Sequence, residues 1–413
     1  MTTKRLTIWL CVMCMLLCGC EAAVGVDRFT NPTVAQEWVP ETTAAPTTVP
    51  TTAPAPVFTA EAYADSLTLQ QQVAQMFFIH CPSQDAQALI ARVQPGGVIL
   101  FSQNINGKTP DTLRAELESL NTGLPYPLLI AVDEEGGSIS RISSSTAFRL
   151  TRFPSPRQAY LDGGEKYLLE IEAEKAALLK SLGIRVNLAP VCDVVNEKTA
   201  FLADRSLQLP PDMTGEMIAK MVTTMQQGGV GAVLKHFPGY GNCDDTHVNA
   251  VVDDRTLDQF RKNDLIPFQK GIEAGVGAVM VCHNIVNALD PSMPASLSPA
   301  VNKLLREELK FGGVAITDDL VMDAISSRYD SGEAAVLAIL AGNDMLITTW
   351  SDSRYQAVLD AVNQGRISPE RIRESAVRIL QWKMDLGLIG EFMPCCLFAA
   401  GLLSIQKFYR NSR

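Results

Sequence analysis

From about Leu67 onward, short apolar runs alternate with longer amphipathic stretches. The short runs are rich in aliphatic and β-branched residues, which predicts buried strands. The longer stretches carry apolar residues at helical spacing. We expect strands at Met76–His80, Gly97–Phe101, Leu128–Asp133, Arg185–Ala189, Ala232–His236, Ala278–His283, Val314–Asp318 and Asp344–Thr348, and helices at Glu165–Leu182, Met213–Gly228, Leu257–Ala274, Pro299–Leu309 and Glu333–Ala341.

Eight strands with intervening helices indicate a parallel α/β architecture, and eight such units are the number in a (β/α)8 TIM-type barrel. A doubly wound open sheet shows the same alternation, so periodicity alone leaves it as an alternative. The chain has no GxGxxG turn after its first strands, which favours the barrel. We therefore expect a single catalytic barrel domain over residues 63–390.

Polar residues follow several predicted strands directly. They include Asp133, the pairs Lys235-His236 and His283-Asn284, and Asp318-Asp319. In a barrel these strand ends meet at one mouth, where active sites are built. The sequence has only four histidines, and three of them lie at these ends or in the next loop: His236, His247 and His283.

The first 20 residues have the features of an export signal. Lys4 and Arg5 precede a short apolar stretch that ends in Leu17-Cys18-Gly19-Cys20. These last four residues are similar to a bacterial lipoprotein processing site, which would make Cys20 the lipidated first residue. We therefore expect a protein anchored by lipid at the outer face of a bacterial cell membrane; an ordinary signal anchor is the alternative.

The next segment, residues 21–62, is dominated by Thr, Pro and Ala, and its composition predicts an extended, solvated tether. Residues 391–413 are apolar but too short to span a bilayer, and their role is not indicated by their composition.

The composition of the chain excludes some classes of ligand. The formal net charge of −10 argues against nucleic acid, because phosphate binding needs clustered cations. The cysteines of the predicted domain are widely spaced without a CxxC pair, so zinc and redox motifs are disfavoured: Cys81, Cys192, Cys243 and Cys282. We expect a monomer.

The segment KHFPGYGNCDDTHVN begins at Lys235. Its Gly and Pro residues predict an irregular loop, on which Asp245 lies two residues before His247. A carboxylate beside an imidazole can hold its tautomer and stabilise the imidazolium, as a general acid/base requires. A capping aspartate and a surface histidine are the alternative reading of the same spacing.

The segment GGVAITDDLVM places Asp318 and Asp319 at a strand end. Adjacent side chains on a strand point to opposite faces, so we expect the two carboxylates to have different roles. One is a candidate nucleophile for glycosyl transfer, and a helix cap is the alternative. Asp133, before a Gly-Gly turn, is a candidate for binding sugar hydroxyls or for organising that turn.

Together these segments resemble the single-domain β-N-acetylhexosaminidases of glycoside hydrolase family 3, over about Leu67 to Leu388. The family loop KHFPGHG, followed by Asp-Ser-His, matches KHFPGYG with Asp245-Thr246-His247. The family motif Ser/Thr-Asp-Asp-Leu matches residues 317–320. The resemblance implies that Asp318 is the nucleophile and that His247, with Asp245, is the acid/base.

The resemblance also implies a set of substrate-binding residues: Asp133, Arg205, Lys235, His236 and His283. It extends to Asp290, downstream of His283. Four positions depart from the family pattern, and each could alter the subsite next to the sugar: Glu134, Ser138, Leu207 and Tyr240.

The implied activity is a retaining exo-hydrolysis of terminal β-linked N-acetylglucosamine from peptidoglycan fragments or related glycans, by double displacement and without metal or organic cofactor. Attack by the substrate's own acetamido group ranks below the covalent route. Two other functions stay open: a phosphorylase of β-N-acetylglucosaminides, and an inactive carbohydrate-binding lipoprotein.

Overall fold

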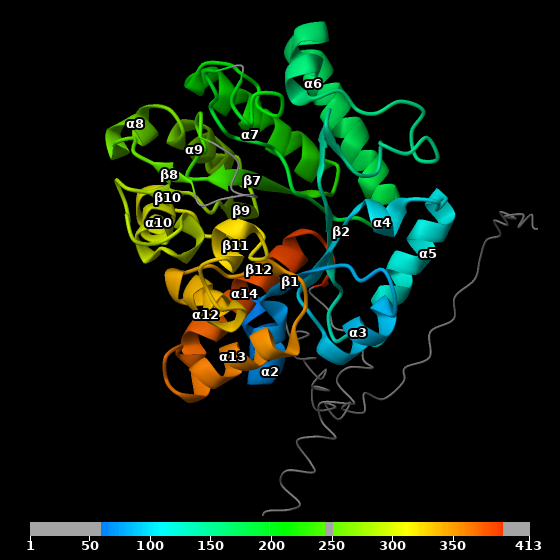
Figure 1. The fold of residues 1–413 in the computed structure, drawn as a ribbon. Coiled ribbons are helices and arrows are strands. Elements are labelled where there is room, and N and C mark those ends of the chain that lie inside the picture. The colour runs from blue at the N-terminus through cyan, green and yellow to red at the C-terminus, as the bar shows by residue number, and fades with distance from the viewer. Residues whose placement is uncertain (1–58, 198, 244–250, 391–413) are drawn as a thin grey trace, which may run out of the picture. The chain divides into compact units, whose positions relative to one another are not determined.

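The computed structural model describes residues 59–197, 199–243 and 251–390. Within them, eight strands form one parallel sheet (Figure 1): β1 (Phe77–His80), β2 (Gly97–Leu100), β3 (Leu129–Val132), β6 (Val186–Asn187), β7 (Gly231–Phe237), β9 (Ala278–Val281), β11 (Val314–Thr317) and β12 (Leu346–Thr348). Each lies within or overlaps one of the eight predicted strands.

The sheet closes on itself almost completely. Its order is β11-β9-β7-β6-β3-β2-β1-β12, so that each strand lies beside its neighbours in the chain. The two end strands meet through a parallel bridge between Ile316 and Met345, and the amide of Thr317 donates to the carbonyl of Met345 at 3.0 Å. The prediction of a (β/α)8 barrel is confirmed, and the open-sheet alternative is wrong.

Helices connect the barrel strands and surround them (Figure 1). They are α1 (Ala60–Asp65), α2 (Leu69–Gln75), α3 (Ala86–Val93), α4 (Ser102–Ile105), α5 (Pro110–Leu120), α6 (Pro156–Ser181), α7 (Pro211–Gln227), α8 (Leu257–Lys262), α9 (Leu265–Glu273), α10 (Pro299–Lys303), α11 (Asp323–Ser326), α12 (Ser331–Ala341), α13 (Asp352–Asn363) and α14 (Pro369–Asp385), with short helical turns η1 (Ala295–Leu297) and η2 (Leu304–Glu308). Short strands pair outside the barrel: β4 (Glu134–Gly136) with β5 (Ile139–Ser140), and β8 (Val252–Asp253) with β10 (Ile285–Val286).

Two predicted helices differ in the structure. Helix α6 begins nine residues before the expected Glu165, and the backbone leaves helical geometry at Gly163 and Gly164 between its two parts. The helix expected over Leu257–Ala274 is divided into α8 and α9 at Asn263 and Asp264. At this break the Asp264 carboxylate binds the guanidinium of Arg255 at 2.7 Å, a tertiary contact that periodicity does not reveal.

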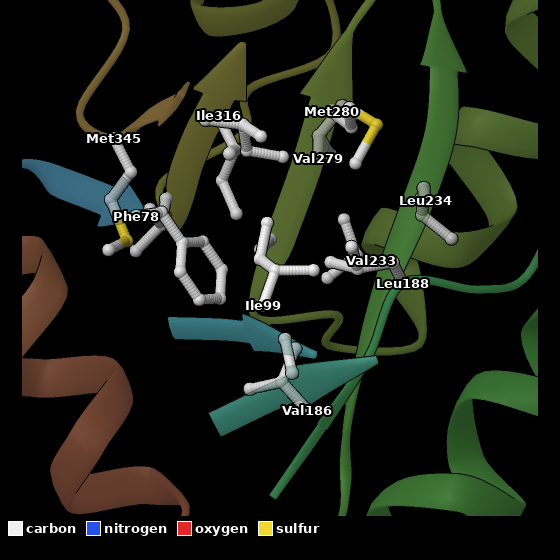
Figure 2. Close-up of a cluster of buried hydrophobic side chains, with 14 of the residues drawn as sticks. Phe78, Ile99, Val186, Leu188, Val233, Leu234, Val279, Met280, Ile316 and Met345 are labelled. Atoms are coloured by element: carbon white, nitrogen blue, oxygen red, sulfur yellow. The ribbon is translucent and has the colours of Figure 1, made fainter. Parts of the chain in front are cut away.

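The barrel interior is filled by aliphatic and aromatic side chains from facing strands. Phe78, Ile99, Val233 and Ile316 point toward one another in Figure 2, and each is at most 1% exposed. Because these positions are closed to water, the barrel is a packed core and not a pore. Polar groups are thereby restricted to its two ends.

Helix α1 corrects one expected boundary. It begins at Ala60, inside the segment 21–62 that composition assigned to the tether. Tyr63 and Ala64 pack against Ala376 and Leu380 of α14, and the Tyr63 hydroxyl donates to the carbonyl of Gly390 at 2.6 Å. The folded part therefore begins at least three residues earlier than expected. In the part of the chain that the structure describes, no helix has the length and apolar character needed to cross a bilayer.

Helix α14 also buries a lysine. Lys383 is fully buried, and its ammonium donates to Oε1 of Gln75 at 2.7 Å. Burial lowers the pKa of Lys383 from its ordinary 10.5 to about 7. Between these two values the unfolded chain binds more protons than the folded one, so stability gains from this residue as the pH rises.

We expect the variant Lys383→Met to lack this pH-dependent gain in stability. The free energy of unfolding of the variant, relative to wild type, should fall as the pH rises from 7 to 9, by on the order of 1 kcal/mol per pH unit. Urea unfolding at pH 7, 8 and 9 measures the difference. The exposed Lys166→Met is the control and should give a flat difference; a flat difference for Lys383→Met too would contradict the prediction.

Candidate active site

A cavity of about 560 Å³ opens at the carboxyl ends of the barrel strands. Its apolar wall includes Ile99, Met280 and Ile347 from three different strands or their ends. Its polar lining contains both acids and bases: Asp133, Ser138, Arg141, Asp204, Arg205, Lys235, His236, Asp318 and Asp319. A concave site with an apolar wall and converging polar groups is typical of a small-molecule site.

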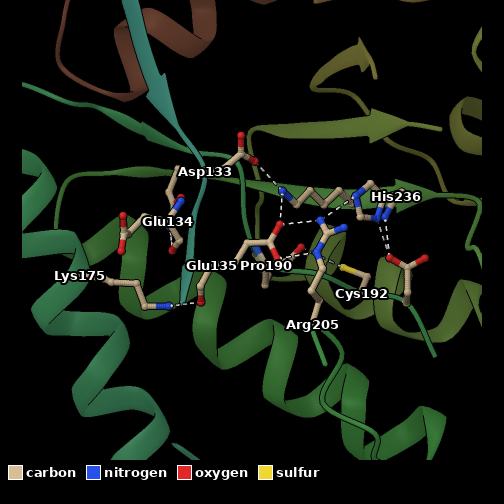
Figure 3. A network of polar contacts seen from close by, with 11 residues as sticks. Asp133, Glu134, Glu135, Lys175, Pro190, Cys192, Arg205 and His236 are labelled. Carbon is tan, nitrogen blue, oxygen red and sulfur yellow. Dashed lines mark hydrogen bonds and ion pairs between the residues drawn. The ribbon is translucent and has the colours of Figure 1, made fainter. Parts of the chain in front are cut away.

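A cluster of buried ions lies on one side of this cavity (Figure 3). The ammonium of Lys235, in β7, is 2.8 Å from Oδ1 of Asp133 and 2.6 Å from Oε1 of Glu135. Arg205 donates to both oxygens of Glu135, at 2.9 Å from Nε and 2.7 Å from a terminal nitrogen. Two cations and two carboxylates thus compensate one another where strands β3 and β7 and the segment after β6 converge.

The cluster stays ionised despite its burial. Burial alone would raise the pKa of Glu135, but Lys235 and Arg205 outweigh it and hold the pKa well below its ordinary value. Burial would likewise lower the pKa of Lys235, yet Asp133 and Glu135 raise it. The site therefore presents fixed donors and acceptors to a ligand at neutral pH.

His236 continues the network. Its Nδ1 lies 2.8 Å from Oδ2 of Asp193, and its Nε2 lies 3.3 Å from Arg205. The other carboxylate oxygen of Asp193 accepts the amide of Tyr240 at 2.7 Å, and the Tyr240 ring contacts the His236 ring edge-on at 5.3 Å between centroids. Asp193 thus fixes both the imidazole and the first turn of the loop that follows β7.

Asp318 and Asp319 lie at the end of β11, on the cavity wall. The backbone amide of Asp319 donates to Oδ1 of Asp318 at 2.8 Å. The Asp319 carboxylate binds Nε2 of His80 at 2.7 Å and the amide of Val321 at 3.2 Å. As expected from strand geometry the two carboxylates have different partners, although both contribute to the cavity lining.

The turn after Asp133 is held by contacts of the Glu134 carboxylate with backbone amides of the same turn. Glu134 is fully buried, and its carboxylate accepts the amides of Arg141 at 2.9 Å and Ile142 at 2.7 Å, and the hydroxyl of Ser143. Gly136 has a φ of 98°, and a Cβ there would lie 2.1 Å from the carbonyl oxygen of Pro154. Glu134 therefore folds the β4–β5 hairpin and is not among the residues that line the cavity, and its effect on the sugar subsite stays a prediction.

The structure brings five of the predicted site residues to the cavity wall: Asp133, Arg205, Lys235, His236 and Asp318. His283 is not among the lining residues. It is fully buried behind Asp319, with Nε2 at 3.0 Å from the Asp319 carbonyl and Nδ1 at 2.7 Å from the Ser296 hydroxyl. His283 thus contacts the backbone beside Asp318, and its role in binding substrate stays a prediction.

The remaining predicted residues have other locations. Asp245, His247 and Cys20 lie outside the described residues, so their roles stay predictions. Asp290 is absent from the cavity lining; its carboxylate accepts the hydroxyls of Ser292 and Ser298, at 2.6 and 2.8 Å. Of the other departures from the family pattern, Ser138 and Tyr240 line the cavity, whereas Leu207 is buried outside it.

Sequence reasoning missed two residues that hold the site together: Glu135 and His80. Glu135 directly follows two other acids after a strand, and this run of acids before a Gly-Gly turn was the available signal. His80 is the fourth histidine and also ends a predicted strand, so the strand-end criterion applied to the other histidines would have found it. In the described parts of the chain no three His, Cys, Asp or Glu side chains are grouped to hold a metal ion.

A barrel with a cavity at its mouth, lined by paired acids and bases, is a site suited to a small polar molecule. The comparisons with known proteins specify the class of protein. Residues 68–382 match the model of the glycosyl hydrolase family 3 N-terminal domain. The chain belongs to glycosyl hydrolase family 3 and is a glycosidase.

Individual relatives agree. A β-hexosaminidase of Nitrosomonas eutropha is 34% identical over 259 residues, which cover 61% of this chain and 73% of the relative. One from Methylococcus capsulatus is 30% identical over 308 residues, which cover 73% and 90%. The solved family 3 β-N-acetylglucosaminidase from Paenibacillus sp. FPU-7 superposes with a TM-score of 0.72 at 32% identity, over 79% of this chain and 64% of that one.

The geometry predicts the effect of removing the charge of Glu135, the carboxylate that binds both Lys235 and Arg205. Glu135→Gln leaves the buried Arg205 without its charged partner, so we expect the free energy of unfolding at pH 7 to fall by about 3 kcal/mol or more. Because the folded pKa of Glu135 is depressed, the difference from wild type should shrink as the pH falls below about 4.5.

Glu333→Gln is the matched control for this substitution, since Glu333 forms a half-exposed ion pair with Arg366. Exposed pairs contribute at most about 1 kcal/mol. Urea unfolding of both variants makes the comparison, and equal losses would show that the buried cluster contributes no more than a surface pair.

Proposed function

We propose that the protein is a retaining exo-β-N-acetylhexosaminidase that removes terminal β-linked N-acetylglucosamine from peptidoglycan fragments or related glycans. The observation that carries the proposal is the position of Asp318 on the wall of a cavity whose lining also contains Asp133, Lys235, Arg205 and His236. The names of the β-hexosaminidase relatives support the choice of an acetamido sugar.

The two sides of the cavity suit two tasks. The compensated ion cluster offers fixed charged donors and acceptors, which suit the neighbouring hydroxyls of a neutral sugar. The Asp318 carboxylate can then attack the anomeric carbon while the glycosidic carbon–oxygen bond breaks. Binding and bond cleavage are thereby assigned to different strands of one barrel.

His247 is proposed as the acid/base, with Asp245 as its partner. In the first step His247 gives its proton to the leaving oxygen. In the second step it takes a proton from water, which attacks the anomeric carbon and releases the Asp318 carboxylate. The stereochemistry at the anomeric carbon is inverted twice and therefore retained.

The test is an assay of the purified chain with 4-nitrophenyl N-acetyl-β-glucosaminide and with the matching β-glucoside. We expect release of nitrophenol from the acetamido sugar only. Asp318→Asn should abolish it, and His247→Ala should lower it by roughly 10²- to 10⁴-fold, the usual contribution of general acid/base catalysis.

Each other outcome points elsewhere. Preference for the glucoside would overturn the proposed specificity and keep the class of enzyme. Turnover that requires added phosphate would make the protein a phosphorylase. Sugar binding by a folded protein without turnover of either substrate would make it a carbohydrate-binding lipoprotein.

The lipid anchor is a separate part of the proposal. If Cys20 is lipidated, the wild-type chain expressed in a bacterium should partition with membranes, and Cys20→Ala should not be labelled by a clickable fatty acid. Cys18→Ala is the matched control and should be labelled like the wild type. Equal labelling of Cys20→Ala and wild type would overturn the assignment of Cys20.

A further inference from the structure

Asp319, on the cavity wall, makes a polar contact that the proposed chemistry leaves unexplained. His80 ends strand β1, and its Nε2 lies 2.7 Å from Oδ2 of Asp319, at the end of β11. The two residues are 239 positions apart in the chain. Their side chains are only 22% and 20% exposed, so this contact is largely shielded from solvent.

His80 is itself held in place. The Thr349 hydroxyl, just after β12, lies 3.2 Å from its Nδ1, and the Phe101 ring contacts it edge-on at 4.7 Å between centroids. A carboxylate oxygen accepts hydrogen bonds, so in this contact the imidazole Nε2 is the donor. The imidazole thus has one orientation, set by groups from the ends of three neighbouring strands.

Asp319 is fixed on two more sides. Its carbonyl oxygen accepts a hydrogen bond from Nε2 of His283 at 3.0 Å, and its Oδ1 accepts the amide of Val321 at 3.2 Å. These contacts fix the side chain of Asp319 and the peptide that follows it, and they restrict the backbone rotations of the residue that carries the N–H. That N–H donates to Oδ1 of Asp318 at 2.8 Å.

We propose that His80 is a positioning residue for the nucleophile and that it acts through Asp319. The donated amide hydrogen fixes the rotation of the Asp318 carboxylate about its terminal bond, and with it the direction of the second oxygen. Nucleophilic attack requires that oxygen to be aligned with the anomeric carbon, and a misplacement of about 1 Å costs up to about a hundredfold in rate. The inference rests on the proposed role of Asp318.

The experiment is a double-mutant cycle on the full-length protein, with the variants His80→Leu, Asp319→Ala and the double variant. We expect His80→Leu to lower kcat by roughly ten- to a hundredfold with KM changed by less than about threefold, because alignment matters in the transition state and not in ground-state binding. In the Asp319→Ala background, His80→Leu should have almost no further effect.

Two conservative variants separate positioning from structure. His80→Gln can place an amide nitrogen near the Nε2 position, so it should recover most of the lost kcat. Thr349→Val keeps the bond from His80 to Asp319 and should have a smaller effect than His80→Leu. Melting temperatures identify variants that are unfolded. If His80→Leu is unfolded, the kcat of His80→Gln relative to wild type tests the positioning role instead.

The outcomes separate this inference from the proposed function. Two results, each with an inactive Asp318→Asn, would overturn the positioning role and leave the nucleophile assignment standing. One is a normal kcat for His80→Leu. The other is a double variant in which the effects of His80→Leu and Asp319→Ala simply add. If Asp318→Asn keeps wild-type activity, the nucleophile assignment itself is wrong, and the role of His80 is wrong with it.

Discussion

The carboxylate of Glu135 is the constraint on which the ion cluster at the barrel mouth depends. It is buried between Lys235 and Arg205 and compensates charge on both. Buried ions are tolerated only when they are paired with good geometry, so the distances within this cluster are nearly fixed. Because the three residues come from the segments after β3 and β6 and from β7, the same pairing holds three parts of the barrel mouth together.

The order of strands in the barrel divides the side chains of the site into two groups. β3, β6 and β7 are neighbours, and their ends supply the compensated ion cluster. On the other side, β11, β12 and β1 are brought together where the sheet closes, and their ends supply Asp318, Asp319, Thr349 and His80. Closure of the barrel therefore makes possible the contact between His80 and Asp319, which an open sheet would separate by its full width.

The barrel and about half of the site residues could be predicted from the sequence, and the reason is physical. Barrel strands are buried on both faces and read as apolar runs, and the first polar residue after each run marks the mouth. That rule located Asp133, Lys235, His236 and Asp318. It did not distinguish which polar residue faces the cavity: Glu134 turned into the hairpin, and His283 into the layer behind Asp319. Such directions depend on partners distant in the chain, as does the break between α8 and α9.

Two buried lysines show why partners, more than burial, determine what such a residue does. Lys383 and Lys235 are both closed to water. The hydrogen-bond partner of Lys383 is the neutral amide of Gln75, and its pKa falls to about 7. Lys235 faces Asp133 and Glu135, and its pKa rises. At neutral pH the lysine beside the cavity therefore keeps its charge and its donated hydrogens, so the cavity wall carries a fixed cation.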